Sequence, residues 1–569
     1  MYIAIVPNRS SPPAILLREG YRDNGKVKNR TLANLSSLPM DQVEAIRRVL
    51  KGEKLTSIDD LFQTVASAKH GHVKAVMLAM DRLGFDKLIA TRPSRERDLV
   101  LAMVASRIFS PSSKLATQRT WKDTSLPQIL DLGEVCEDDL YAAMDWLLER
   151  QDKIEKKLAR RHLKEAGLVL YDLSSSYFEG CKCPLAKLGY NRDGMKGKLQ
   201  VNYGLLTDER GCPVSVSVFE GNVSDPKTLL PAVEKVRERF GINELVLVGD
   251  RGMVSQKQID ALEKMNGVAW ITALKTGAIR KLVDAGAIQL GLFDERNLFE
   301  CEHPDFPGER FVACRNSELA KLRAHKRQSL LDATAKELEK VRAMAGKGGL
   351  KAAKAIGVRV GRVVNKYKVA KHFSLDIGEG TFDFCVDTES VENEASLDGI
   401  YVVRTSLRKS HMSAEDAVRS YKKLSQVERA FRSLKSMDLK VRPIFHHKEN
   451  RVRAHIFLCM LAYYVEWHMK EALRPLLFAD EDQEAKAMRD PVAPAERSAA
   501  ALDKVARKTT PDGQEAHSFK TLLEHLAVIV RNQCARRNES SSPTAPVVIE
   551  TTPDPIQEKA FDLLLQIAP

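Results

Sequence analysis

Two short apolar runs of this chain each end in an aspartate, and a third carboxylate lies in a basic stretch far downstream. The runs are residues 168–172 (LVLYD) and 245–250 (LVLVGD), and the third acid is Glu428. Carboxylates are the hard oxygen ligands that Mg²⁺ prefers, and a two-metal site for phosphoryl transfer holds its ions about 3.5–4 Å apart between shared carboxylates. Asp172, Asp250 and Glu428 therefore predict divalent-metal chemistry on a phosphodiester.

Both apolar runs have the composition of buried strands. Each is a stretch of Val and Leu bounded by Gly or polar residues, which is typical of a strand covered on both faces of an α/β sheet. If the two strands are adjacent and parallel, Asp172 and Asp250 leave the sheet at the same carboxyl edge, where such sheets bind ligands. No special loop is then needed to bring the two acids together.

The residues between and after the two runs complete a mixed sheet. Alternating segments on either side of a turn predict a hairpin, and apolar spacing predicts one helix before the second run and one after it. The predicted strands are 198–207, 213–220 and 268–274, and the predicted helices are 225–240 and 256–265. Together with the two runs, these elements follow the order of a ribonuclease-H-like α/β core.

The third acid is predicted to lie on a helix. Residues 415–435 contain no Gly or Pro, and an apolar stripe along them would pack on the sheet. The stripe consists of Val427, Phe431 and Leu434. Tyr421, Glu428 and Lys435 recur at intervals of seven residues, which places the three side chains near one another on a neighbouring face of the helix.

With these motifs the chain resembles the DDE transposases of bacterial insertion sequences, in the group marked by a Y-x2-R-x3-E-x6-K signature. Tyr421, Glu428 and Lys435 match the signature, whereas Leu424 stands at its arginine position and removes one expected basic contact. The segments beginning at Asp172 (DLSSSYFE) and Asp250 (DRGM) resemble the first and second acidic motifs of the family. The resemblance covers most of the chain from about residue 160 to 470.

The resemblance implies a transposase that cleaves insertion-sequence ends and joins them to target DNA by two-metal phosphoryl transfer. Asp172, Asp250 and Glu428 would be the catalytic residues and would hold two Mg²⁺ ions, with Mn²⁺ able to substitute. Such ions activate water or a DNA 3′-hydroxyl for in-line attack and stabilise the leaving oxygen.

The resemblance also implies the partners. These are DNA, as terminal inverted repeats and as target, and a second copy of the chain in a synaptic homodimer. Tyr421 and Lys435 would hold the transposon end near the metals. Arg251 and Arg432 are added as DNA contacts because each lies close to an acid in the sequence and arginine binds phosphate well.

The spacing of the acids indicates an insertion in the core. Asp250 and Glu428 are far more distant in sequence than Asp172 and Asp250, and the excess is too long for a loop. In the family the insertion is often mostly β. The predicted parts are a mainly helical N-terminal region that binds DNA ends (1–160), the first part of the core (161–275), an inserted basic subdomain (276–395), the second part of the core (396–475) and a partly flexible C-terminal region (476–569).

Individual elements are predicted outside the core and within the insertion. The N-terminal region begins with strand-like segments and continues as helices, and the insertion contains one long helix between strand-like runs. The predicted strands are 2–6, 14–21, 297–316, 373–387 and 400–405, and the predicted helices are 98–109, 139–163, 317–345, 451–473 and 518–534.

The net charge of +13 is concentrated in one place. Residues 315–371 contain 16 Lys and Arg against four Asp and Glu. Such a segment neutralises phosphates and gives salt-dependent affinity for nucleic acid. A solvated helix that uses lysine for solubility is the competing interpretation.

Other classes of function have little support. No run of eighteen apolar residues and no signal-peptide core occur, so a cytoplasmic protein without membrane contact is expected. The nine cysteines show neither a metal nor a disulfide pattern, and neither GxGxxG nor a complete P-loop is present. The alternatives are a catalytically silent, transposase-derived DNA-binding protein and an unrelated hydrolase with paired carboxylates, which the basic segment disfavours.

Overall fold

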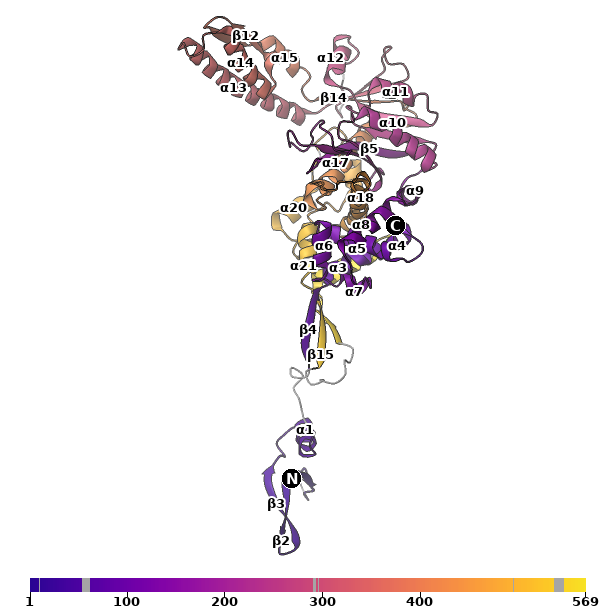
Figure 1. Ribbon diagram of the computed structural model, residues 1–569, viewed down its shortest axis with the longest axis vertical. Helices are drawn as coiled ribbons and strands as arrows, with labels where there is room; N and C mark the ends of the chain where they lie inside the picture. The colour runs from indigo at the N-terminus through magenta and orange to yellow at the C-terminus, as the bar shows by residue number, and fades with distance from the viewer. Residues whose placement is uncertain are drawn as a thin grey trace. The chain divides into compact units, whose positions relative to one another are not determined.

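A computed structural model of the chain describes residues 1–9, 11–53, 62–289, 293–294, 296–494, 496–536 and 547–568 (Figure 1). It divides into two compact units. One unit comprises residues 1–68 and 530–552, and the other comprises residues 69–529 and 553–569.

The described residues of the first unit form two small sheets and one helix. One sheet is antiparallel with the order β1-β2-β3, and the other has the order β16-β15-β4. The elements are β1 Tyr2–Val6, β2 Ala14–Asp23, β3 Lys26–Asn34, α1 Met40–Leu50, β4 Phe62–Lys69, β15 Val530–Arg536 and β16 Val547–Glu550. The predicted strands 2–6 and 14–21 are confirmed, and the region expected to be mainly helical therefore begins with strands.

Helices occupy residues 71–162 at the start of the second unit. They are α3 Gly71–Arg82, α4 Phe85–Ile89, α5 Arg95–Phe109, α6 Lys114–Trp121, α7 Leu126–Ile129, α8 Glu137–Leu148 and α9 Gln151–His162. Helix α5 is capped by Ser94, whose hydroxyl accepts a hydrogen bond from the Arg97 N–H at 3.2 Å, and it is buried from Leu99 to Ile108. The helix predicted for 139–163 is two helices, α8 and α9, separated at Glu149 and Arg150.

An eight-stranded mixed sheet follows and carries the core of the second unit. Its order is β10-β11-β14-β9-β8-β5-β6-β7. Strands β5, β8 and β9 are parallel neighbours, and the flanking pairs are antiparallel. The strands are β5 Gly167–Tyr177, β6 Gln200–Thr207, β7 Pro213–Glu220, β8 Leu245–Gly249, β9 Val268–Ala273, β10 Leu298–Cys301, β11 Arg310–Arg315 and β14 Ile400–Thr405. The fold of this unit is thus a mixed α/β fold.

Helices cover the sheet and close the core. Helix α17 packs on β5, while the long buried helix α18 packs on β7 and on α5 and α8. These helices are α10 Pro226–Glu234 with the π-helical turn η1 Lys235–Arg239, α11 Gln256–Leu262, α12 Thr276–Asp284, α16 Ala414–Lys422, α17 Leu424–Arg432 with the π-helical turn η3 Ser433–Met437, and α18 Glu449–Ala472. The apolar stripe Val427, Phe431 and Leu434 is buried as predicted.

The helix expected to run unbroken from 415 to 435 changes geometry twice. It is interrupted at Lys423, where the Gln426 N–H donates to the Lys423 carbonyl three residues back, at 2.8 Å, as in a tightened turn. It then becomes π-helical from Ser433. The seven-residue spacing that relates Tyr421 to Lys435 therefore does not keep both side chains on one face.

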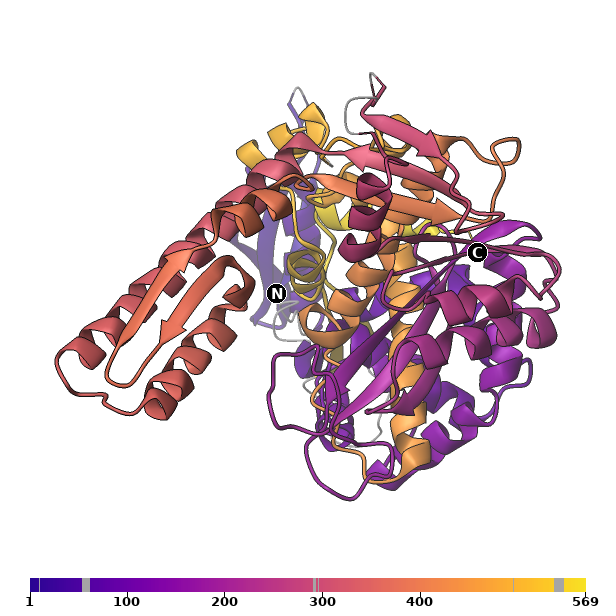
Figure 2. The same ribbon diagram turned by 90° about the horizontal axis from the view of Figure 1, so that it is seen from above.

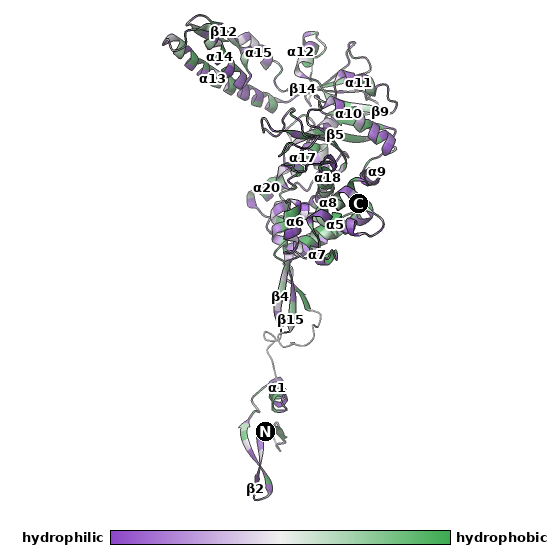
Figure 3. Ribbon diagram, in the orientation of Figure 1, coloured by the Kyte–Doolittle hydropathy of each residue, from purple (hydrophilic) through white to green (hydrophobic). Residues whose placement is uncertain are grey.

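The part of the chain that leaves the sheet is shorter than predicted and mainly helical. It comprises α13 Ser317–Gly346, α14 Ala353–Tyr367, the 3₁₀ turn η2 Ala370–His372, β12 Phe373–Ile377, β13 Phe382–Val386 and α15 Thr388–Ala395 (Figure 2). Helices α13 and α14 mix hydrophilic and hydrophobic residues along their length (Figure 3) and enclose a separate small core with β12 and β13. Strands β10 and β11, expected within the inserted subdomain, instead extend the sheet, because β14 supplies β11 with backbone partners over six residues.

The C-terminal region contains further helices. They are the 3₁₀ turn η4 Arg474–Leu476, α19 Gln483–Met488, α20 Ala499–Arg507, α21 Phe519–Leu526 and α22 Pro555–Leu565. The helix predicted for 518–534 ends at Leu526, and the following residues form β15. The serine run 540–542 lies outside the described residues. Within the described part of the chain, no helix is both long and apolar enough to cross a membrane.

Candidate active site

Strands β5 and β8 place Asp172 and Asp250 side by side. Their parallel register pairs Tyr171 with Gly249. The next residue is Asp172 within β5 and Asp250 directly after the end of β8. Neighbouring strands lie about 4.8 Å apart, so the two side chains leave the sheet at the same level. The prediction that the two strands are parallel neighbours is confirmed. Asp172 nevertheless lies within its strand, because β5 continues to Tyr177 in its pairing with β6.

Helix α17 brings Glu428 towards these two aspartates. The pKa of Asp172 is raised to about 7, first by burial and then by the negative charges of Asp250 and Glu428. The Leu173 N–H, which donates to Asp172 Oδ1 at 2.8 Å, and the charge of Arg192 oppose this shift. The charges of Asp250 and Glu428 thus both act on Asp172. We call Asp172, Asp250 and Glu428 the acid cluster.

The acid cluster fits divalent ions. Three like charges raise one another's energy when one of them is buried, and a divalent cation offsets that repulsion. In the part of the chain that the structure describes, the three carboxylates do not all approach within 4.8 Å of one another, so one ion would not reach all of them without movement. A pair of ions about 3.5–4 Å apart spans a wider set of carboxylates.

Tyr421 lies against the second aspartate. It is near the end of α16, and its hydroxyl donates a long hydrogen bond of 3.4 Å to Asp250 Oδ1. Burial, with the charge of Asp250, raises the pKa of Tyr421, so the phenol keeps its proton. Both residues line a cavity of about 230 Å³, together with Arg251, Arg323 and Tyr401. The cavity joins the second acid to two arginines.

Lys435, predicted to contact DNA, is buried in an ion pair. Its Nζ donates to Asp193 Oδ1 at 3.0 Å, and its side chain is 11% exposed. Arg442 also pairs with Asp193, and the Tyr177 N–H donates to Asp193 Oδ2 at 3.0 Å. We call Asp193, Lys435 and Arg442 the Asp193 cluster. Asp193 and Arg442 were missed in the sequence because residues 191–194 (NRDG) have the composition of an ordinary turn.

The two arginines added as DNA contacts lie on the surface, and the remaining signature position lies in the core. Arg251 and Arg432 are exposed, and the charge of Arg251 acts on Tyr421. Leu424, at the arginine position of the signature, is buried in the main core. A leucine at this position therefore packs in the core and supplies no contact to a ligand.

The basic segment contains structural and exposed cations. Arg327 pairs with Asp398, and Arg323 donates to the carbonyls of Leu397 and Ile400 at 3.3 Å each, so these two arginines attach α13 to the start of β14. The exposed cations are spread over both helices of the segment. Those on α14 and just before it are Lys351, Lys354, Arg359, Arg362 and Lys366.

Two family models match the chain. Residues 182–465 match the model of the transposase DDE domain, a range that includes Asp250 and Glu428 and begins ten residues after Asp172. Residues 3–61 match the model of the N-terminal domain of IS1634 family transposases. The chain thus carries a transposase DDE domain, and its N-terminal region is similar to the N-terminal domain of IS1634 family transposases.

Other comparisons add little. No curated protein matches the chain. Among solved structures, the chain is similar to the piggyBac transposase in a synaptic complex with hairpin DNA, at 8% sequence identity and a TM-score of 0.34, over 80% of this chain and 78% of that one. A likeness of this strength does not define a fold.

Proposed function

We propose that this transposase cleaves the ends of its insertion sequence and joins them to target DNA by two-metal phosphoryl transfer at the acid cluster. The observation that supports the proposal best is the register of β5 and β8, which sets Asp172 beside Asp250. The charge of Glu428 acts on the same place from helix α17. A buried carboxylate with two acidic neighbours is the environment that a divalent ion stabilises.

The proposal includes a ribonuclease-H-like core. Strands β7, β6 and β5 form an antiparallel meander, and β8 and β9 continue the sheet in parallel beyond β5. This order, followed by a helix that carries the third acid, supports such a core. The Y-x2-R-x3-E-x6-K group is proposed on Tyr421, Glu428 and Lys435, with Leu424 as its departure.

The side chains around the acids have distinct proposed roles. Asp172, Asp250 and Glu428 would hold two Mg²⁺ ions, or Mn²⁺ in their place, which when bound supply charge neutralisation at the phosphate and activation of the attacking hydroxyl. The protonated Tyr421 hydroxyl orients Asp250. Arg251 is exposed beside Asp250 and would bind a DNA phosphate, as would Arg432 on α17.

DNA and a second copy of the chain are the proposed partners. Transposition joins two ends, so a synaptic homodimer on paired terminal inverted repeats is proposed, with the N-terminal region contacting the ends. Light scattering of the protein on end-sequence duplexes measures the stoichiometry. One protomer on one duplex that still joins paired ends would refute the dimer.

A cleavage assay tests the proposed function. The full chain is incubated with duplexes that carry the element's ends, and Mg²⁺-dependent cuts at those ends are expected, with none after chelation. Asp250→Asn and Glu428→Gln should lose cleavage and keep DNA binding, because each keeps its shape and loses the charge that holds the ion. End binding by the wild type without cleavage would favour the catalytically silent alternative.

The exposed cations of α14 are proposed to contact the DNA backbone. Reversal of Lys354, Arg359 and Arg362 should weaken DNA binding for all sequences and flatten the plot of log affinity against log salt by about one unit for each lost phosphate contact. The matched control reverses Lys321 and Lys340, exposed lysines of α13 that pair with glutamates at 2.7 and 2.6 Å. An unchanged slope in the α14 variant would identify that face as merely solvated.

A further inference from the structure

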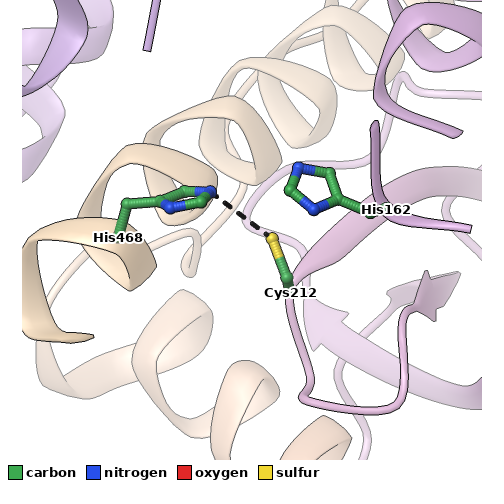
Figure 4. A group of neighbouring side chains, drawn as sticks. All are labelled: His162, Cys212 and His468. Carbon is green, nitrogen blue, oxygen red and sulfur yellow. Dashed lines mark hydrogen bonds between the residues drawn. The ribbon is translucent and has the colours of Figure 1, made fainter. Parts of the chain in front are cut away.

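Three potential metal ligands from distant segments meet inside the second unit, away from the acid cluster. His162 ends α9, Cys212 lies in the turn between β6 and β7, and His468 lies on α18 (Figure 4). Their ligand atoms all lie within 4.8 Å of one another. Across the described residues, no other set of three or more His, Cys, Asp or Glu side chains converges this closely.

The local structure holds each of the three in place. The carboxylate of Asp208 accepts from the Cys212 N–H at 2.8 Å and from the Arg210 N–H at 2.9 Å, which fixes the turn that carries the thiol. The Tyr464 hydroxyl hydrogen-bonds His162 Nε2 at 3.1 Å and fixes that ring. Partners of this kind orient the ligands in known metal sites.

The His468 ring is held by packing. The rings of Tyr464 and Trp467 pack edge-on against it, with centroids 4.7 and 4.9 Å away. Its Nε2 lies 3.8 Å from Cys212 Sγ. The imidazole and the thiol therefore already face each other.

Burial favours the protonation state that a metal needs from histidine. It lowers the pKa of His162 to about 4 and that of His468 to about 3, so both imidazoles are neutral at physiological pH. Burial also raises the pKa of Cys212, which is therefore a thiol as long as no metal ion is bound. Binding of a metal ion would release this proton to solvent and leave a thiolate bonded to the ion.

We propose that His162, Cys212 and His468 form a transition-metal site of two nitrogens and one sulfur, with Zn²⁺ as its ion. Tetrahedral zinc places its ligand atoms about 3.3–3.8 Å apart, a spacing that Cys212 and His468 already meet and that the remaining pairs reach by shifts of about 1 Å. Thiolate and imidazole select zinc over the Mg²⁺ of a carboxylate site. A fourth position is left for water.

The charges around the site are nearly balanced. Arg161 and Arg210 face the histidines and oppose a cation. Arg210 is paired with Asp208 at 3.1 Å, and Asp208 and Glu471 add negative charge beside Cys212. The thiolate formed on binding offsets one of the two charges of the ion. The bound ion and its thiolate therefore add a net charge of one, which is no greater than the charge of Arg210 beside the same histidines.

A zinc ion here would join three separate elements. It would link the last helix of the 71–162 segment, the β6–β7 turn and the buried helix α18, which packs on β7. Such an ion contributes to folding stability and takes no part in phosphoryl transfer. The proposed role of the zinc ion is therefore distinct from that of the acid cluster.

Cobalt titration of the full chain tests the site. Co²⁺ replaces Zn²⁺ in such sites, and its bond to a thiolate gives a charge-transfer absorption band. One Co²⁺ per chain with this band is expected, displaced by Zn²⁺ and unaffected by Mg²⁺. Absence of the band in the wild type would overturn the proposal.

Variants assign the band to its ligands. Cys212→Ser should lose the band, and His162→Gln, at the least buried of the three positions, should weaken Co²⁺ affinity about 100-fold or more. The matched control is Cys459→Ser. Cys459 is buried like Cys212 and lies on α18, 4.0 Å from His455, and no third ligand converges on this pair among the described residues. Loss of the band in Cys459→Ser, or its retention in Cys212→Ser, would contradict the assignment.

Two further measurements remove the remaining ambiguities. If Cys212→Ser does not fold, chelation of the wild type decides the question, since a lower melting temperature is expected and an unchanged one would refute a structural ion. Asp172→Asn should bind Co²⁺ like the wild type. The zinc site and the proposed catalytic function can therefore fail independently.

Discussion

Two clusters of charged side chains lie along the same strand, β5, and they differ in how their charge is balanced. The acid cluster brings three carboxylates together, and burial with acidic neighbours raises the pKa of Asp172 to about 7. The Asp193 cluster pairs one buried carboxylate with Lys435 and Arg442. A carboxylate that pairs with lysine and arginine side chains forms a structural link. Carboxylates that are neighbours of one another predict a bound metal ion.

The largest expected effect distinguishes Asp172 from Asp193 by how cleavage in their cysteine variants depends on the metal ion. Asp172→Cys should lower the rate of end cleavage in Mg²⁺ by about 10³-fold or more, because a thiol does not replace a hard oxygen ligand worth several kcal/mol. Part of the rate should return in Mn²⁺, which tolerates sulfur better. Initial cleavage rates in the two metals measure this. In the Asp193→Cys control, any loss should be equal in both metals, and Mn²⁺ rescue of that variant would erase the distinction.

The second effect concerns stability of the balanced cluster. Asp193→Asn should lower the free energy of unfolding by about 3 kcal/mol, because it leaves Lys435 and Arg442 without their anion in a largely buried place. Urea unfolding of the full chain measures the change. Asp152→Asn is the control, since Asp152 is 64% exposed and its pair with Arg239 is solvated. Equal midpoints for both variants would show that the Asp193 cluster is not a structural link.

The third prediction concerns His72, a buried ionisable side chain that belongs neither to the acid cluster nor to the Asp193 cluster. Burial lowers the pKa of His72 from 6.5 to about 4, and its Nδ1 has no hydrogen-bond partner among the residues that the structure describes. The unfolded chain binds the proton first as pH falls from 6.5, so stability is full above that pH and decreases towards pH 4. At pH 5 the contribution of this residue is a loss of about 2 kcal/mol. Between pH 8 and pH 5, the free energy of unfolding should decrease less in His72→Gln than in the wild type. An unchanged pH profile would contradict the assignment. The control is His447→Gln, because His447 is exposed.

The smallest expected effect is opposite in sign to that of Asp193→Asn. In the presence of a chelator, Asp172→Asn should raise the free energy of unfolding by about 1 kcal/mol, because it removes one of three neighbouring negative charges. Mg²⁺ should stabilise the wild type and have no such effect on the variant. Thermal unfolding with and without Mg²⁺ measures both, and a destabilised variant would remove the contrast between the clusters.

Much of the fold was predictable from local patterns. The Val- and Leu-rich runs identified β5 and β8, alternation identified the β6–β7 hairpin, and helical periodicity located the long helix α13. Patterns of this kind are local because backbone hydrogen bonds and side-chain periodicity extend over a few residues. The same locality explains the errors, since the interruption at Lys423 and the π-turn after Arg432 leave no mark in composition.

The sequence by itself determined which carboxylates stand next to buried strands and where the excess positive charge lies. Only the tertiary structure decided that Lys435 pairs with Asp193, 242 positions away, and that Cys212 faces His468 across 256 positions. Contacts at such separations depend on how strands and helices pack, and packing is a property of the assembled core. Local residue preferences determine the helices and strands. The packing of these elements against one another brings the residues of each site together.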